Sequence, residues 1–336
     1  MPGIFLSFTR NLTVYPQMYK AREFYLLPVN GLINRTRAIA SAHIFALEFG
    51  MKFRFLWPDE EIMNCDPSDI YSTRYVSKYY IKESEFVPSE LFEARNLFRF
   101  GIDGCNLLVA GGRDGEQRFI PQLKSELQFN SNLLRISIKS GGLFHACRKI
   151  DCLDCDTFRE KRREVYNEIG TSQTVLEEIY EMEKGLAKRY VGVHLRLTDK
   201  SHQKVKQNRM LKEYRKRLSK LGEKGKLPDL IICGDEAKGI ENLKDYFQKN
   251  GVRVFSRSNL EFDRSKRRNT ISAFADWHLL AKCISVIFVG NTSFAYEAIV
   301  LGGTINDSTR LNPRFVNTRA RIQSWKKRIT WFIPKS

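Results

Sequence analysis

The stretch YVGVHLRLTDK, residues 190–200, joins an apolar run to a charged end. The run is typical of a buried strand, and it is followed at once by Arg196, Asp199 and Lys200. An arginine that ends a core strand needs an anionic partner, so the stretch predicts a binding site at the carboxyl end of this strand. His194, inside the strand, is interpreted either as part of that site or as a buried core histidine.

Strands and helices alternate after residue 188. This order predicts an α/β fold with a largely parallel sheet covered on both faces, in which ligands bind at the carboxyl ends of the strands near a switch in strand order. The expected strands are 189–195, 229–234, 252–256, 285–290 and 304–308, and the expected helices include 204–226, 237–250, 273–283 and 292–303.

Three strand ends are expected to meet at one edge of this sheet: 196–200, 234–236 and 290–294. The last, GNTSF, offers the hydroxyls of Thr292 and Ser293 at the N-terminus of a helix, which is a natural phosphate site. Arg196 can add a permanently charged, bidentate clamp. The pattern therefore predicts binding of a phosphorylated ligand.

The N-terminal part begins with a β-loop-α-β unit, with strands at 23–29 and 51–57, a turn at 30–35 and a helix at 36–50. Gly31 is expected to give the turn its tight backbone. Residues 64–150 show no clear period apart from a strand at 132–138, and residues 159–188 are helical in character. The resulting division is 1–157, a helical connection at 158–187, a second domain at 188–310 and a tail at 311–336.

A chain of 336 residues with 42% hydrophobic residues has ample material for a packed interior. Its net charge of +18 favours polyanions, anionic membrane surfaces or phosphorylated small molecules without choosing among them. Ten Lys or Arg residues lie between Lys204 and Lys226, against two Glu residues. A basic nucleic-acid-binding protein stays open as an alternative, although no nucleic-acid module is recognisable and specific nucleic-acid binding is not expected.

No run of about 18 apolar residues is present, and the N-terminal IFLSF is too short for a signal-peptide core, so a soluble cytoplasmic chain is expected. Seven cysteines at irregular spacing favour reduced thiols over disulfides. Cys147, Cys152 and Cys155, with His145, could supply zinc ligands, but the spacing favours structural thiols, and no metal is expected.

Three stretches resemble motifs of the GDP-fucose-dependent fucosyltransferase superfamily, which includes α1,6-fucosyltransferases, nodulation fucosyltransferases and protein O-fucosyltransferases. They are GLINRTRAIASAHIFALEFG at 31–50, GVHLRLTDK at 192–200 and FADWHLLAKCISVIFVGNTSFAYEAIVLGG at 274–303. The resemblance covers roughly residues 23–57 and 188–303. It implies a GT-B-like fold, with two Rossmann-type domains whose mainly parallel sheets face a central cleft.

The resemblance also implies an inverting, metal-independent glycosyltransferase that moves fucose from GDP-fucose to a glycan acceptor, with no cofactor. Another GDP-sugar or nucleotide-sugar donor is the alternative within the enzyme class. The leaving diphosphate gains negative charge, so a fixed guanidinium and helix-terminal amides would stabilise the transition state more than the ground state.

Carried across by motif, the resemblance assigns Arg196 as the catalytic residue that binds the β-phosphate of the donor. It assigns donor-binding roles to Asn34, Arg35, His194, Asp276, Thr292, Ser293 and Phe294, with Asp276 binding the guanine base. Further candidates are Gly31, Asp199, Lys200, Asp235 and Glu236. Asp276 could instead be a helix-surface carboxylate, and Asn34 could simply shape its turn.

Two positions depart from the pattern of this superfamily. Leu197 stands where a second arginine is common, so part of the diphosphate clamp would come from Lys200 or Arg35. Lys204 stands where the α1,6 branch has an acidic residue that has been considered as a base. Asp199, Asp235 and Glu236 are the hypotheses for activating the acceptor.

Overall fold

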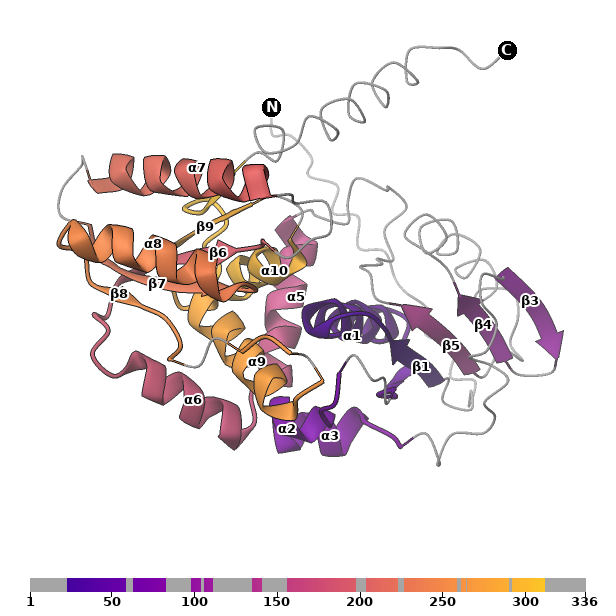
Figure 1. The fold of residues 1–336 in the computed structure, drawn as a ribbon. Helices are drawn as coiled ribbons and strands as arrows, with labels where there is room; N and C mark the ends of the chain where they lie inside the picture. Colours follow the sequence, from indigo (N-terminus) through magenta and orange to yellow (C-terminus); the bar gives the residue numbers. More distant parts are fainter. Residues whose placement is uncertain are drawn as a thin grey trace, which may run out of the picture.

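The protein contains two five-stranded sheets with helices packed around them (Figure 1). The computed structural model describes residues 23–58, 63–82, 98–103, 106–110, 135–140, 156–197, 204–222, 227–258, 261–263, 265–289 and 292–311. The long gaps, 83–97, 111–134 and 141–155, lie between or directly after elements of the N-terminal sheet. The C-terminal sheet is described almost completely. The α/β class predicted from the sequence is confirmed.

The C-terminal sheet has the strand order β10-β9-β6-β7-β8, and every described pair of neighbouring strands is parallel. Numbered from its own first strand, this is the order 5-4-1-2-3, which is that of a Rossmann-type half. The strand order switches between β6 and β9, because β7 and β8 lie on one side of β6 and β9 and β10 lie on the other. The strands are β6 (Tyr190–Leu195), β7 (Asp229–Gly234), β8 (Val254–Phe255), β9 (Ser285–Val289) and β10 (Thr309–Leu311).

Alternate side chains of β6 pack on opposite faces of the sheet. Val191, Val193 and Leu195 belong to a core shared with α7 (Lys204–Gly222) and α8 (Ala237–Lys249). Gly192 faces the other side, where a Cβ atom would lie 2.8 Å from Leu280 Cδ2 of α9 (Arg267–Ala281). His194 points to that same side, because side chains two residues apart share one face of a strand. Helix α10 (Ser293–Gly302) packs against α9 there.

The N-terminal sheet has the order β2-β1-β5-β4-β3, with parallel pairs except between β3 and β4. Its long helix α1 (Leu32–Glu48) begins four residues earlier than expected, so the predicted turn at 30–35 lies partly inside the helix. The positive φ of 71° belongs to Asn30, whereas Gly31 has a φ of −67°. The expectation for Gly31 was therefore wrong: Asn, which tolerates the left-handed region, makes the tight bend. The strands are β1 (Glu23–Pro28), β2 (Lys52–Phe55), β3 (Phe98–Asp103), β4 (Asn106–Ala110) and β5 (Arg135–Ser140).

Two helices form the segment that was expected to connect the halves. They are α5 (Asp156–Ile169) and α6 (Gln173–Glu183), and Gly170, with a φ of 59°, lies in the break between them. Helix α5 packs against both α1 and α10, and α6 packs along α9. The buried residues Tyr166 and Trp277 belong to one continuous apolar core that also includes Phe24 of the N-terminal sheet. The connection thus contributes to the core of both halves.

Several predicted boundaries differ from the structure. Residues 304–307 form turns, and the last described strand begins only at Thr309, so the strand expected at 304–308 is wrong. Helix α9 begins at Arg267, six residues before its predicted start. The region 64–150 contains two short helices, α2 (Pro67–Ile70) and α3 (Thr73–Tyr79), that no sequence period predicted. Within the described residues, no helix is long and apolar enough to cross a membrane.

Candidate functional site

Arg196 lies at the carboxyl end of β6, directly beside the end of β7. The two strands pair in register from Tyr190 opposite Asp229 to Leu195 opposite Gly234, so Arg196 and Asp235 are the next residues on each side. The guanidinium Nε of Arg196 lies 3.6 Å from Oδ2 of Asp235, and the Arg196 side chain is 32% exposed. Two of the three strand ends that the sequence predicted to converge, those at 196–200 and 234–236, meet at this pair.

Asp235 also accepts a backbone hydrogen bond. The amide of Leu197 donates to its Oδ1 atom at 2.7 Å. One carboxylate thus contacts the Arg196 side chain and the main chain that follows it, which restrains where the guanidinium can point. The short spacing between the strand ends depends on Gly234, because a Cβ atom there would lie 2.9 Å from Leu195 Cβ.

His194 connects β6 to the first turn of α10. Its ring stacks on Phe294 with centroids 5.0 Å apart and an interplanar angle of 12°. The histidine is 4% exposed, and its Nδ1 atom has no hydrogen-bond partner among the described residues. Burial lowers the pKa of His194 to about 4, Asp235 opposes the shift and Arg196 adds to it. The imidazole is therefore neutral at pH 7, and its Nδ1 atom can form one further hydrogen bond.

Among the described residues, no side chain caps the N-terminus of α10. Thr292 occupies the N-cap position, yet its hydroxyl donates at 3.3 Å to the carbonyl of Val289 and makes no capping hydrogen bond to the helix. No acidic residue lies in the first turn. Ser293 and Phe294, which open the helix, are partly exposed. An uncapped helix start carries free amide donors and a positive partial charge, which suits an anion.

Leu197 points away from this edge into the core under α8. It is 1% exposed, and a Cβ atom added to Gly239 would lie 2.2 Å from its Cδ1 atom. Glu236 is engaged as the N-cap of α8, where its carboxylate accepts the Gly239 amide at 2.6 Å. The position at which the fucosyltransferase pattern often has a second arginine is therefore filled by an apolar residue that holds α8 against the sheet.

Asp276 lies on α9 in a partly buried ion-pair network. Its Oδ1 atom accepts from Nε of Arg257 at 2.8 Å, and Nη1 of Arg257 donates to Glu178 of α6 at 2.7 Å. Burial raises the pKa of Asp276, and Arg257 opposes that shift. The backbone carbonyl of Asp276 lies 4.0 Å from Sγ of Cys233, the residue that pairs with His194 across β6 and β7. Asp276 thus lies one strand away from the His194 ring, on the same side of the sheet.

Arg257 was not among the predicted site residues. A signal for it was present, because Arg257 directly follows the strand expected at 252–256, just as Arg196 follows the strand at 189–195. The same strand-end argument that selected Arg196 applies to it. Its partner Glu178 could not be found in this way, because it lies on the connecting helix α6 and meets Arg257 only through the fold.

Of the N-terminal candidates, Asn34 and Arg35 differ sharply. Asn34 lies partly exposed in the first turn of α1. Arg35 is completely buried: it donates to the carbonyls of Asn30 at 3.0 Å and Pro58 at 3.1 Å, and its guanidinium lies 4.8 Å from the ring centre of Trp57. Arg35 therefore fastens the loop before α1 to the chain after β2.

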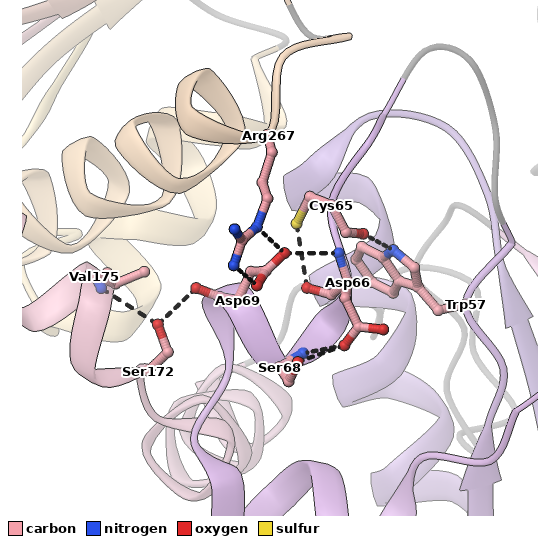
Figure 2. Close-up of polar contacts among 8 residues, drawn as sticks. All are labelled: Trp57, Cys65, Asp66, Ser68, Asp69, Ser172, Val175 and Arg267. Atoms are coloured by element: carbon pink, nitrogen blue, oxygen red, sulfur yellow. Dashed lines mark hydrogen bonds and ion pairs between the residues drawn. The ribbon is translucent and has the colours of Figure 1, made fainter.

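An ion pair between α9 and α2 joins the two halves. Arg267, at the start of α9, makes a two-pronged ion pair with Asp69 of α2, including a bond from Nε at 2.8 Å (Figure 2). Ser172, the N-cap of α6, donates to the Asp69 carbonyl at 2.6 Å and accepts from the Val175 amide. The hydrogen bond from Arg267 lowers the pKa of Asp69. Helix α9, which carries Asp276, is thereby attached to the N-terminal half.

The residues around Asp69 are themselves fixed locally (Figure 2). The amide of Asp66 donates to Asp69 Oδ2 at 3.0 Å, and Asp66 in turn accepts the Ser68 amide at 2.8 Å. The indole of Trp57 donates to the Cys65 carbonyl at 2.7 Å. Since Trp57 also contacts Arg35, this network continues from the interface into the loop before α1.

Some predicted residues lie outside the described residues. Asp199, Lys200 and Gly290 are among them, as are His145, Cys147, Cys152 and Cys155. Within the described part of the chain, no three His, Cys, Asp or Glu side chains gather as they would around a metal ion. The described cysteines, Cys65, Cys233 and Cys283, are buried free thiols.

Comparison with solved structures gives the fold independent support, whereas no protein-family model and no curated protein sequence matches the chain. FUT1 from Arabidopsis thaliana, a mutant in complex with GDP, has a TM-score of 0.57 at 14% identity, with 84% of this chain and 69% of that one covered. NodZ from Bradyrhizobium, a fucosyltransferase, has a TM-score of 0.56 at 16% identity, with 84% and 94% covered. POFUT1 in complex with GDP has a TM-score of 0.52 at 8% identity, with 87% and 98% covered.

The chain therefore has the fold of the fucosyltransferase NodZ and of the GDP complexes of FUT1 and POFUT1. This confirms the GT-B-like class that the three sequence motifs implied. NodZ has also been crystallised with GDP as an α-1,6-fucosyltransferase, at 16% identity and a TM-score of 0.56.

Proposed function

We propose that the protein is a glycosyltransferase that moves fucose from GDP-fucose to a glycan acceptor, with inversion at the sugar and without a metal ion. The observation that carries the proposal is the stacking of His194 on Phe294. It brings the end of β6, and with it Arg196, beside the uncapped start of α10. A permanent cation and a helix N-terminus at one strand edge are the groups that a nucleoside diphosphate requires.

The proposed chemistry is a direct displacement at the anomeric carbon. The acceptor hydroxyl attacks from the face opposite the diphosphate, the sugar–phosphate bond breaks, and GDP leaves with the bonding pair. Arg196 and the first amides of α10 would stabilise the negative charge that develops on the leaving oxygen. Of the three hypotheses for the base, Asp199 is favoured, because Asp235 and Glu236 already accept backbone amides.

Arg35 and Lys200 were the proposed sources of a second cation for the diphosphate. The burial of Arg35 beneath Trp57 and Pro58 favours Lys200 for that role and leaves Arg35 to shape the loop that presents Asn34. In this proposal, Asn34 approaches the donor from the N-terminal half, while Thr292 and Ser293 contact the diphosphate.

A different nucleotide sugar is a second candidate donor, favoured by one observation. Asp276, the proposed contact to guanine, already uses Oδ1 to accept from Arg257. A carboxylate that must accept from two donors of guanine would have to share that oxygen or release it. Which nucleobase Asp276 can bind thus depends on whether its ion pair with Arg257 persists when the donor is bound.

The test is a thermal-shift comparison of GDP, UDP, ADP and CMP, because a ligand that binds only the native state raises its melting temperature. Stabilisation by GDP, together with GDP-fucose turnover that persists in excess EDTA, is the expected result. Stabilisation by another nucleotide alone would transfer the proposal to the second candidate. Loss of turnover in EDTA with rescue by Mn²⁺ would contradict the metal-free mechanism.

A further inference from the structure

Arg257 is held at all three nitrogens of its guanidinium. Its Nε donates to Oδ1 of Asp276 at 2.8 Å, its Nη1 donates to Oε2 of Glu178 at 2.7 Å, and its Nη2 donates to the carbonyl of Ser272. The Arg257 side chain is only 14% exposed. Because Ser272 and Asp276 lie on α9 and Glu178 lies on α6, two helices fix this one arginine after β8.

The partners of Arg257 are restrained as well. Ser272 and Asp276 are four residues apart, so they share one face of α9. The hydroxyl of Ser272 donates to Oε2 of Glu178 at 2.8 Å, which joins α6 to that face. If Arg257 released Asp276, a charged N–H would stay without an acceptor in a mostly buried cluster, which is costly. The contact is therefore expected to persist when a ligand binds.

The carboxylate of Asp276 has one oxygen left to accept a hydrogen bond. Oδ1 accepts from Arg257, whereas no group among the described residues donates to Oδ2. The backbone carbonyl of Asp276 lies 4.0 Å from Sγ of Cys233, two residues before Asp235. Asp276 thus offers a single acceptor atom near the strand ends of the proposed donor site.

We propose that Arg257 is a positioning residue that sets nucleobase specificity by restricting Asp276 to one accepting oxygen. This inference rests on the proposed function, in which Asp276 contacts the base of the donor. Guanine presents the ring N1–H and the 2-amino group side by side, and their N–H bonds are nearly parallel, so one oxygen can lie in line with only one of them. Hypoxanthine has the same N1–H and lacks the amino group. The site therefore takes the diphosphates of 6-oxopurines as a class and gains little from the amino group.

The first measurement is the affinity of the wild-type protein for GDP and for inosine diphosphate, by titration calorimetry. A hydrogen bond to a charged group changes affinity by about tenfold or more, so a GDP preference below about threefold is expected when the amino group has no in-line acceptor. A wild-type preference of about tenfold or more would overturn the proposal. This comparison needs no variant, so it decides the proposal even if a substitution prevents folding.

Arg257→Lys tests the restraint itself. Lysine keeps the charge but has one nitrogen in place of the planar fork, so it cannot hold Asp276, Glu178 and the Ser272 carbonyl together. The charge is kept because burial raises the pKa of Asp276 and Arg257 opposes that shift. The carboxylate can then turn both oxygens to the base, and the preference for GDP over inosine diphosphate should rise to about tenfold or more.

The ratio of the two affinities separates positioning from a purely structural role. A structural role would weaken both nucleotides equally, so an unchanged ratio in folded Arg257→Lys would overturn the proposal. The matched control is Arg253→Lys, the same substitution in the pair with Asp229, where β7 begins. Its ratio should equal that of the wild type, and a rise as large as that of Arg257→Lys would also overturn the proposal.

Asp276→Asn separates this proposal from the proposed function. It should lower the affinity for both nucleotides by about tenfold or more, because it removes the accepting charge. Unchanged GDP binding by Asp276→Asn, with turnover of GDP-fucose intact, would overturn the role of Arg257 and leave the proposed function in place. Wild-type protein that binds UDP or ADP and neither 6-oxopurine diphosphate would contradict both. Thermal unfolding without ligand checks that each variant is folded.

Discussion

Asp235 contacts both the Arg196 side chain and the backbone amide of the next residue, Leu197. Its Oδ2 atom lies 3.6 Å from Nε of Arg196, and its Oδ1 atom accepts the Leu197 amide at 2.7 Å. The carboxylate that was considered as a base is therefore better suited to positioning the guanidinium. Since the arginine has rotatable bonds and a partly exposed side chain, such a restraint reduces the orientations it can adopt.

Asp235→Ala should lower turnover by about 10²-fold, because it removes the group that orients Arg196. Asp235→Asn keeps an oxygen for the Leu197 amide and loses the charge, so its turnover should lie between those of Ala and wild type. Steady-state kinetics of both variants, with Glu236→Gln as a control at the α8 cap, makes the comparison. Wild-type turnover in both Asp235 variants would show that Asp235 does not position Arg196.

The buried His194 should make stability depend on pH. Its pKa is about 4 in the fold, against 6.5 for an ordinary histidine. Between these values the unfolded chain binds the proton and the native chain does not, so this contribution to stability is complete above 6.5 and is lost as pH falls toward 4. His194→Phe, which can still stack on Phe294, should reduce the fall in unfolding free energy between neutral pH and pH 5.

Urea unfolding at several pH values measures this slope. His43 and His278, whose pKa values burial also lowers to about 4 and about 3, remain in both proteins and provide a residual slope. A slope identical in wild type and His194→Phe would contradict a neutral, buried His194.

Leu197→Arg should destabilise the protein by about 3 kcal/mol without raising turnover, because it places a charge in the core against Gly239. Leu197→Met, which conserves volume, should cost less than about 1.5 kcal/mol. Chemical denaturation compares the two. An arginine variant that is as stable as wild type and faster in turnover would mean that position 197 reaches the site.

The Asp69–Arg267 pair should contribute modestly and in a salt-dependent way. Arg267 is largely exposed, so Arg267→Gln should lower the unfolding free energy by no more than about 1 kcal/mol. The pKa of Asp69 is lowered from 3.8, so the stabilisation is complete above that value and disappears as pH falls through the lower folded value.

Denaturation at neutral and acid pH, and at low and high salt, tests this pair. Arg253→Gln, which breaks the pair with Asp229 inside one half, is the matched control. A large loss that salt does not reduce would indicate that Arg267 does more than form a screened surface pair.

The C-terminal half was predictable because its signals are local. Each of the apolar runs of β6, β7 and β9 is bounded by polar residues, and the strand-helix alternation requires parallel pairing. Strand-end reasoning found Arg196 and Asp235 for the same reason, since register places neighbouring strand ends together. The strand wrongly expected at 304–308 shows the limit of this method: TINDS has β-branched residues, yet its Asn and Asp favour turns.

Long-range partners were not predictable from one sequence. Arg257 meets Glu178 from 79 residues away, and Asp69 meets Arg267 from 198 residues away. No local pattern indicates that Arg35 is buried. Its guanidinium contacts the Pro58 carbonyl and the Trp57 ring, and both residues follow β2, more than 20 residues along the chain. Charged side chains look alike in sequence whether they face a ligand or an internal partner.

The most direct measurement of the central claim is the turnover of GDP-fucose by Arg196→Lys, with the thermal shift by GDP measured on the same protein. Lysine keeps the charge and loses the planar fork that can hold two phosphate oxygens. If the fork stabilises the departing diphosphate, turnover should fall by roughly 10²-fold or more while the melting temperature without ligand changes little. Near-normal turnover by the folded Lys variant would contradict the account and remove Arg196 from the mechanism.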